Sequence, residues 1–170
     1  MIAPVFVDTN VFVYARDAGE PAKRAAARAW LEFLWRERCG RTSVQVLSEY
    51  YVTVTRKLRP GLTPDDAWDD VNGLFAWRPQ ALDDALLERA YTIQSRHRLS
   101  WWDSLVVAAA LAQDCALLLT EDLQDGGIYD GLTARSPFKL AAGESVSRYD
   151  IAPQAARRHP TRGRPRRISV

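Results

Sequence analysis

The chain has 170 residues, of which 47% are apolar, so it is long enough to form one domain with a substantial core. Its longest uninterrupted apolar run, from Leu105 to Ala112, is far too short to cross a bilayer, and we recognise no signal peptide at the N-terminus. The only cysteines, Cys39 and Cys115, are too few for a disulfide framework or a four-ligand zinc site. We therefore expect a cytoplasmic protein that makes no membrane contact.

The formal charge of +2 is unevenly distributed along the chain. Six arginines and no acid follow Asp150, namely Arg157, Arg158, Arg162, Arg164, Arg166 and Arg167. Taking those 6 from the 23 basic residues leaves 17 against 21 acidic ones, so the rest of the chain carries about −4. The last segment is rich in Pro, Gly and Arg and has little to bury. We expect one domain over residues 1–150 and a basic, disordered tail over residues 151–170.

The first half of the chain is predicted to form one strand followed by three helices. Val5–Val7 predicts a short buried strand, which ends at Asp8-Thr9-Asn10, three residues that are all good helix N-caps. Helical patterns follow over Pro21–Arg38, Ser43–Arg59 and Pro64–Trp77. Glycine at position 40 and the Pro60-Gly61 pair mark the ends of the first two helices.

The second half continues the alternation. It contains a short extended piece at Gln80–Leu82, helices over Asp83–His97 and from Ser100 onward, and strands at Ala116–Leu119 and Leu132–Arg135. The helix that begins at Ser100 is apolar all round over Leu105–Ala112, so it should be buried. Strands that alternate with helices predict an α/β fold, with a parallel sheet covered on both faces.

Two acidic residues follow the predicted buried strands. Asp8 stands directly after the first strand, and Asp122 comes shortly after the strand that ends at Leu119. In an open parallel sheet, ligands bind in the crevice outside the carboxyl ends of the strands. Two carboxylates at that edge can share a hard metal ion. The alternative is that each carboxylate caps the helix or turn that follows it.

Asp103 lies three residues after Ser100, ahead of the apolar run of its helix. Ser-x-x-Asp at a helix start is typical of a capping box, which explains this acid structurally. The functional alternative is that the first turn of this buried helix directs the carboxylate into the same crevice. Trp101 and Trp102 would then form a wall at the helix start, and otherwise they are ordinary core or surface aromatics.

Glu49 lies off the apolar stripe of its predicted helix, roughly 140° from the centre of the stripe. A glutamate in this position usually faces solvent. A functional role requires instead that this face of the helix line the crevice, with Thr53 and Arg56 beside it.

Four segments, each built around one of these acids, together resemble the sequence motifs of PIN domains. They are Val7–Tyr14 around Asp8, Val46–Tyr51 around Glu49, Ser100–Ala110 around Asp103 and Leu119–Gly126 around Asp122. The segment from Gly131 to Phe138 is similar to the closing segment of a subgroup of VapC-like toxins. The resemblance covers about residues 2–140. Its strength lies in the order and spacing of four motifs that are individually weak.

The resemblance implies a three-layer α/β/α sandwich with a central, mainly parallel sheet, and a metal-dependent endoribonuclease that hydrolyses RNA phosphodiesters. It implies Mg²⁺ or Mn²⁺ held by Asp8, Glu49, Asp103 and Asp122. Asp125 and Glu121 remain alternatives or additions to Asp122, and Thr9 and Thr120 offer hydroxyls that could orient the carboxylates. It further implies the toxin of a type II toxin–antitoxin pair, with a small antitoxin protein as partner and a homodimeric state.

Carboxylates suit this chemistry, because oxygen ligands favour Mg²⁺ and Mn²⁺, which activate water and offset developing charge. The sequence has no Gly-x-Ser-x-Gly elbow and no Gly-rich phosphate loop. His97, the only histidine in the expected domain, lies between Arg96 and Arg98, so we expect a helix-end or phosphate-contact role for it. Two alternatives stay open: a nucleic-acid-binding module that uses the arginine tail, and a PIN nuclease of RNA processing without a toxin role.

Overall fold

The structure is a computed structural model that describes residues 2–143. The predicted tail over residues 151–170, with its six arginines, and the end of the predicted domain lie outside the described residues. Among residues 2–143, no helix is long and apolar enough to cross a membrane.

A five-stranded sheet forms the centre of the fold, in the order β2-β1-β3-β5-β4. The strands are β1 (Val5–Val7), β2 (Gly40–Arg41), β3 (Leu117–Leu119), β4 (Ile128–Tyr129) and β5 (Leu132–Arg135). All neighbours pair in parallel except β4 and β5, which are antiparallel. Every residue of β1 and β3 is buried, as expected of strands covered on both faces. The carboxyl ends of these two adjacent strands therefore meet at one edge of the sheet.

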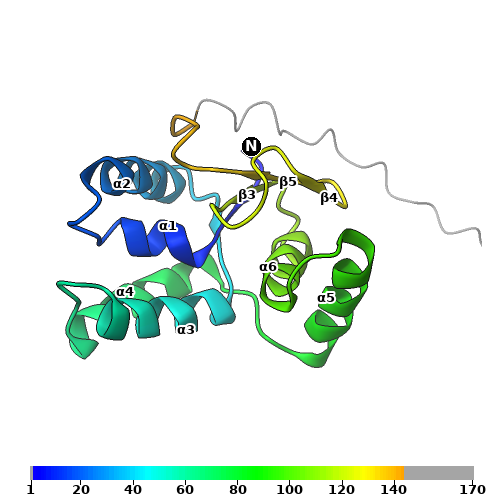
Figure 1. The fold of residues 1–170 in the computed structure, drawn as a ribbon, viewed down its shortest axis with the longest axis horizontal. Coiled ribbons are helices and arrows are strands. Elements are labelled where there is room, and N and C mark those ends of the chain that lie inside the picture. The colour runs from blue at the N-terminus through cyan, green and yellow to red at the C-terminus, as the bar shows by residue number, and fades with distance from the viewer. Residues whose placement is uncertain (1, 144–170) are drawn as a thin grey trace, which may run out of the picture.

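Helices cover the sheet on two flanks, with α1 to α4 gathered on one side and the α5–α6 pair on the other (Figure 1). They are α1 (Thr9–Tyr14), α2 (Pro21–Arg36), α3 (Val44–Val52), α4 (Pro64–Leu74), α5 (Asp84–His97) and α6 (Trp101–Ala112). A π-helical turn at Thr53–Lys57 extends α3, and a 3₁₀ turn at Phe75–Trp77 extends α4. The result is the predicted three-layer α/β/α architecture, with a mainly parallel sheet.

Side-chain caps explain where several helices begin. The oxygens of Ser43, Thr63, Asp83 and Ser100 each accept a hydrogen bond from the backbone N–H three residues on. The sequence patterns located these helices, but they missed three short elements. Helix α1, strand β2 and strand β4 are each too short to show a periodicity. The extended piece at Gln80–Leu82 is reduced to a single bridge between Gln80 and Ser43.

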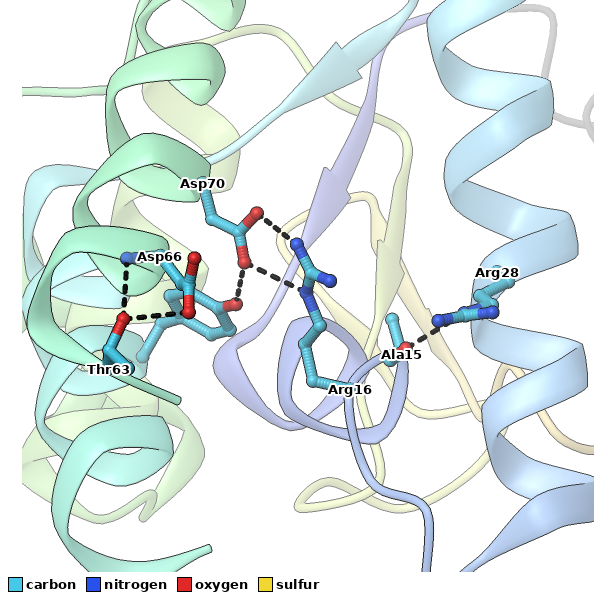
Figure 2. Close-up of polar contacts among 7 residues, drawn as sticks. Ala15, Arg16, Arg28, Thr63, Asp66 and Asp70 are labelled. Atoms are coloured by element: carbon cyan, nitrogen blue, oxygen red, sulfur yellow. Dashed lines mark hydrogen bonds and ion pairs between the residues drawn. The ribbon is translucent and has the colours of Figure 1, made fainter. Parts of the chain in front are cut away.

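A polar junction ties the segment just after α1 to α3 and α4. The guanidinium of Arg16 bonds both oxygens of Asp70, one of them through Nε at 2.9 Å, and Figure 2 shows the two side chains facing each other. The hydroxyl of Tyr50 donates to the same carboxylate. Burial is the main cause that raises the pKa of Tyr50, so this phenol stays neutral and available as a donor. The junction fixes α3 against its neighbours and so positions Glu49, which directly precedes Tyr50.

The segment after β5 closes the fold against α1 and α2. The indole Nε1 of buried Trp30 donates to the carbonyls of Pro137 and Leu140, at 3.2 and 3.1 Å. The ring of Phe138 meets Tyr14 edge to face, with the centroids 5.2 Å apart. The closing segment identified in the sequence is therefore part of the packed domain.

Candidate active site

Asp8 is the buried centre of the site. It stands between β1 and α1, where its backbone N–H bonds Leu119 O of the neighbouring strand at 3.1 Å, and only 5% of the residue is exposed. One carboxylate oxygen accepts from Thr9 N at 2.7 Å and the other from the Thr120 hydroxyl at 2.7 Å. Burial raises the pKa of Asp8 to about 7, and these hydrogen bonds only partly oppose that rise. The negative charges of Asp122 and Glu49 contribute to the same rise.

Asp122 is held near Asp8 by the loop after β3. Its backbone N–H donates to the Thr120 hydroxyl at 3.1 Å, so one threonine links Asp8 and Asp122. The Asn10 amide nitrogen donates to the Asp122 carboxylate at 3.1 Å and to Thr120 at 3.4 Å. The sequence singled out Asn10 only as a possible helix cap. Its role in holding Asp122 depends on the adjacency of β1 and β3, which no local pattern reveals.

Glu49 reaches the same site from α3. Its carboxylate accepts from the Thr9 hydroxyl at 3.2 Å and from Gln45, one helical turn earlier, at 2.9 Å. The side chain is half-buried, so it is not the freely solvated glutamate of the structural alternative. Thr9 bonds Asp8 through its N–H and Glu49 through its hydroxyl. The expectation that Thr9 and Thr120 orient carboxylates is thus confirmed by their hydrogen bonds.

Asp103 is engaged locally, as the capping-box alternative anticipated. Its N–H donates to the Ser100 hydroxyl oxygen at 3.1 Å, and that hydroxyl donates to the Asp103 carboxylate at 2.7 Å. The charges of Glu49 and Asp122 are among the causes that raise the pKa of Asp8. The structure therefore places Glu49 and Asp122 within electrostatic range of Asp8, whereas the hydrogen bonds of Asp103 are made with Ser100 at the start of α6.

The acids considered as alternatives to Asp122 are occupied by other partners. Glu121 forms an ion pair with Lys23 at 2.7 Å. Asp125 accepts from Ser136 N at 2.9 Å, which is the main cause that lowers its pKa, and it also pairs with Arg135 at 3.0 Å. Glu121 therefore ties the loop after β3 to α2, and Asp125 ties the same loop to the end of β5.

His97 serves the helix end rather than this acidic cluster. It contacts the Asp130 carboxylate at 2.8 Å, and Arg96 bonds the other oxygen of the same carboxylate at 2.6 Å. These two contacts lower the pKa of Asp130. His97 is the last residue of α5, as expected of a helix-end residue, and its partner Asp130 lies in the turn between β4 and β5, whereas a phosphate contact stays a prediction.

The donor set around Asp8 fits a hard divalent cation. All the candidate ligands are carboxylate oxygens, and no ion pair between described residues includes Asp8, Glu49, Asp103 or Asp122. Asn10 Oδ1 is a buried acceptor with no hydrogen-bond partner, so the site carries unmatched negative and acceptor capacity. Over residues 2–143, however, no three potential ligands stand close enough to form a ready-made metal site. A cation would have to draw the side chains together.

Comparisons with known proteins agree with this fold. The family model described as the PIN domain matches residues 5–124. One similar solved structure is that of VapC20 from Mycobacterium tuberculosis, described as a Sarcin-Ricin loop cleaving toxin. The two structures have a TM-score of 0.52 and 21% sequence identity, over 69% of this chain and 89% of that one. At this identity the likeness shows the fold. No curated protein matches the chain.

Proposed function

This chain belongs to the PIN-domain family, and from that premise we propose that it is a metal-dependent endoribonuclease. The observation that carries the proposal is the state of Asp8. Its carboxylate is buried, lies within the electrostatic range of Glu49 and Asp122, and has no cationic partner among the described side chains. A protein that uses such a carboxylate only as a helix cap has no need to gather two further acids around it, because the Thr9 N–H and the Thr120 hydroxyl already satisfy it.

Asp8, Glu49 and Asp122 would hold a divalent cation, Mg²⁺ or Mn²⁺, and the family motif adds Asp103 as the fourth ligand. When bound, the cation supplies positive charge that activates water and offsets the charge developing on the phosphodiester. The chain's own polar groups orient the ligands. Thr120 and Thr9 N fix the two oxygens of Asp8, Gln45 and the Thr9 hydroxyl fix Glu49, and Asn10 fixes Asp122.

The bonds of Asp122 support it as the acid contributed by the loop after β3. Asp122 shares Thr120 with Asp8, whereas Glu121 and Asp125 are each paired with a basic residue. Substitution of Asp122 should therefore reduce cleavage far more than substitution of Asp125.

The toxin role is the finer part of the proposal. The fold resembles that of VapC20, a protein described as a toxin that cleaves the Sarcin-Ricin loop. On this likeness and the sequence motifs, we propose that RNA is the substrate, that a small antitoxin protein is a partner and that the chain forms a homodimer. A short reading frame directly upstream of the coding sequence would support the toxin role over a role in RNA processing.

Induced expression in bacteria tests this proposal. We expect the wild type to arrest growth and to generate new RNA ends that sequencing maps to a small set of positions. Glu49→Gln should relieve the arrest and remove those ends. Glu88→Gln is the matched control, since Glu88 lies exposed on α5 and its side chain makes no bond within residues 2–143. Equal growth and equal RNA ends in all three strains, at matched protein levels, would reject the proposal.

A further inference from the structure

A groove of about 530 Å³ adjoins the acidic cluster. Its lining includes Thr53, Lys57, Leu82 and Trp102, and it shares Thr9, Gln45 and Glu49 with the candidate active site. The volume falls within the range of about 300 to 1,000 Å³ that is typical of small-ligand sites. We call this feature the Trp102 groove. Whatever occupies it would lie directly beside the carboxylates.

The apolar surface of the Trp102 groove is unusually open to solvent. Trp102 is 61% exposed, and Leu82, Val44 and Val52, which also line the groove, are 49%, 45% and 43% exposed. Trp101, the preceding residue, packs instead against the core. Trp102 is thus not needed for the packing of α6. An exposed indole beside a polar site is a suitable platform for stacking a planar group.

The charges of the groove favour a nucleotide over an uncharged ligand. Lys57 lies at the end of the π-helical turn after α3 and, among the residues the structure describes, makes no hydrogen bond or ion pair. It is a free cation eight residues after Glu49, the one acid among the lining residues of the groove. Thr53, on the same turn, adds a hydroxyl. An aromatic face, a free ammonium and a hydroxyl match a base, a phosphate and a sugar.

We propose that the Trp102 groove binds an unpaired nucleotide that flanks the cleaved bond, with the base stacked on Trp102 and a neighbouring phosphate on Lys57. The inference rests on the proposed nuclease function and adds two residues of this chain, Trp102 and Lys57, that would recognise the substrate beside the cleaved bond. A paired base cannot reach an indole in this way, because both of its faces are already stacked. The groove therefore selects single-stranded or looped RNA.

The test is binding by full-length protein in an Asp8→Asn background, so that affinity is measured without cleavage. Fluorescence anisotropy would compare a labelled single-stranded RNA, the same RNA with abasic sites, and a duplex of the same sequence, all in Mn²⁺. Trp102→Ala should weaken binding of the single strand about 5-fold to 100-fold. It should leave duplex binding unchanged, and Trp102→Phe should restore most of the loss.

Trp68→Ala is the matched control. Trp68 is 53% exposed and lines a neighbouring groove that shares Val44, Ser48 and Val52 with the first but contains neither Glu49 nor Thr9. We expect the Trp68→Ala variant to bind the single-stranded RNA as tightly as the Asp8→Asn parent does. Lys57→Ala should lower the salt dependence of binding by about 0.7 in the slope of log K against log salt, while Trp102→Ala should leave that slope unchanged.

Unchanged affinity in Trp102→Ala would overturn the proposal, as would equal losses for the single strand and the duplex. An effect of Trp102→Ala on self-association alone would assign the groove to protein contact and would equally overturn it. Cleavage by the chain without substitutions is measured separately. Its absence would reject the nuclease function whatever the binding results, so the two failures can be told apart.

Discussion

Asp8→Asn is expected to stabilise the metal-free protein at neutral pH, because the wild type must hold a buried charge there. Burial raises the pKa of Asp8 from an ordinary value of 3.8 to about 7. At 1.36 kcal/mol per pH unit, this difference corresponds to about 4 kcal/mol against the ionised form. Asparagine keeps an acceptor for the Thr9 N–H but loses the bond accepted from the Thr120 hydroxyl. The loss of this bond offsets about 1 kcal/mol of the stability gained by removing the buried charge. The expected net gain at pH 8 is about 3 kcal/mol in the free energy of unfolding.

The sign of the pH dependence follows from the direction of the shift. Between about pH 4 and pH 7 the folded wild type binds more protons at Asp8 than the unfolded chain does. Its free energy of unfolding should therefore fall, relative to the variant, by about 1.4 kcal/mol per pH unit up to about pH 7 and stay level above. Urea unfolding of both proteins in chelator, from pH 5 to pH 8, measures this difference.

Asp130→Asn supplies a control of opposite sign. His97 and Arg96 lower the pKa of Asp130, so its charge stabilises the fold, and that contribution is lost as the pH falls through the lowered pKa. Its removal should reduce the free energy of unfolding at neutral pH. Parallel pH curves for wild type and Asp8→Asn, or a less stable Asp8→Asn at pH 8, would refute the reasoning about the buried charge.

Four further predictions concern metal, ligands, packing and the tail. Mn²⁺ should raise the melting temperature of the wild type, by about 2.7 kcal/mol in stability at a hundred times the dissociation constant, and Asp103→Asn should shrink that gain. Asp122→Asn should abolish RNA cleavage in a gel assay while Asp125→Asn retains it. Equal loss of cleavage in the two variants would contradict the assignment of Asp122 as the acid of the site. Asp70→Asn should lower the free energy of unfolding by about 1 kcal/mol, since Arg16 loses a charged partner whose side chain is only 22% exposed, and an unchanged urea midpoint would argue against the junction. Deletion of residues 153–170 should weaken RNA binding at low salt and flatten its salt dependence, and an unchanged slope would remove the tail from RNA binding.

The sequence predicted the fold well where elements are long or wholly buried. Val5–Val7 and the three leucines of β3 read as strands because each is an unbroken apolar run. The helices followed from periodicity and from caps such as Ser43. Strand β2 could not be predicted, because Gly40-Arg41 has no strand pattern. A Cβ at Gly40 would lie 2.5 Å from the ring of Trp77, so tertiary packing fixes this residue.

The candidate site was predictable in its acids but not in its connections. Asp8 and Asp122 could be placed at one edge of the sheet, because both follow buried strands. The links made by Asn10 and Gln45 require knowledge of which strands and helices are neighbours. Asp103 shows the limit of pattern reasoning most clearly. Its spacing from Ser100 fits both a capping box and a catalytic motif, and the observed capping bonds leave its catalytic role as a prediction.

Cleavage of a labelled RNA by purified full-length protein tests the central claim most directly. The wild type and Glu88→Gln should cleave in Mg²⁺ or Mn²⁺, lose all cleavage in chelator and regain it when metal is restored. Asp8→Asn should stay folded and inactive at every metal concentration. Cleavage by Asp8→Asn at the wild-type rate, or cleavage by the wild type in chelator, would contradict the assignment of this buried carboxylate to a metal-dependent nuclease site.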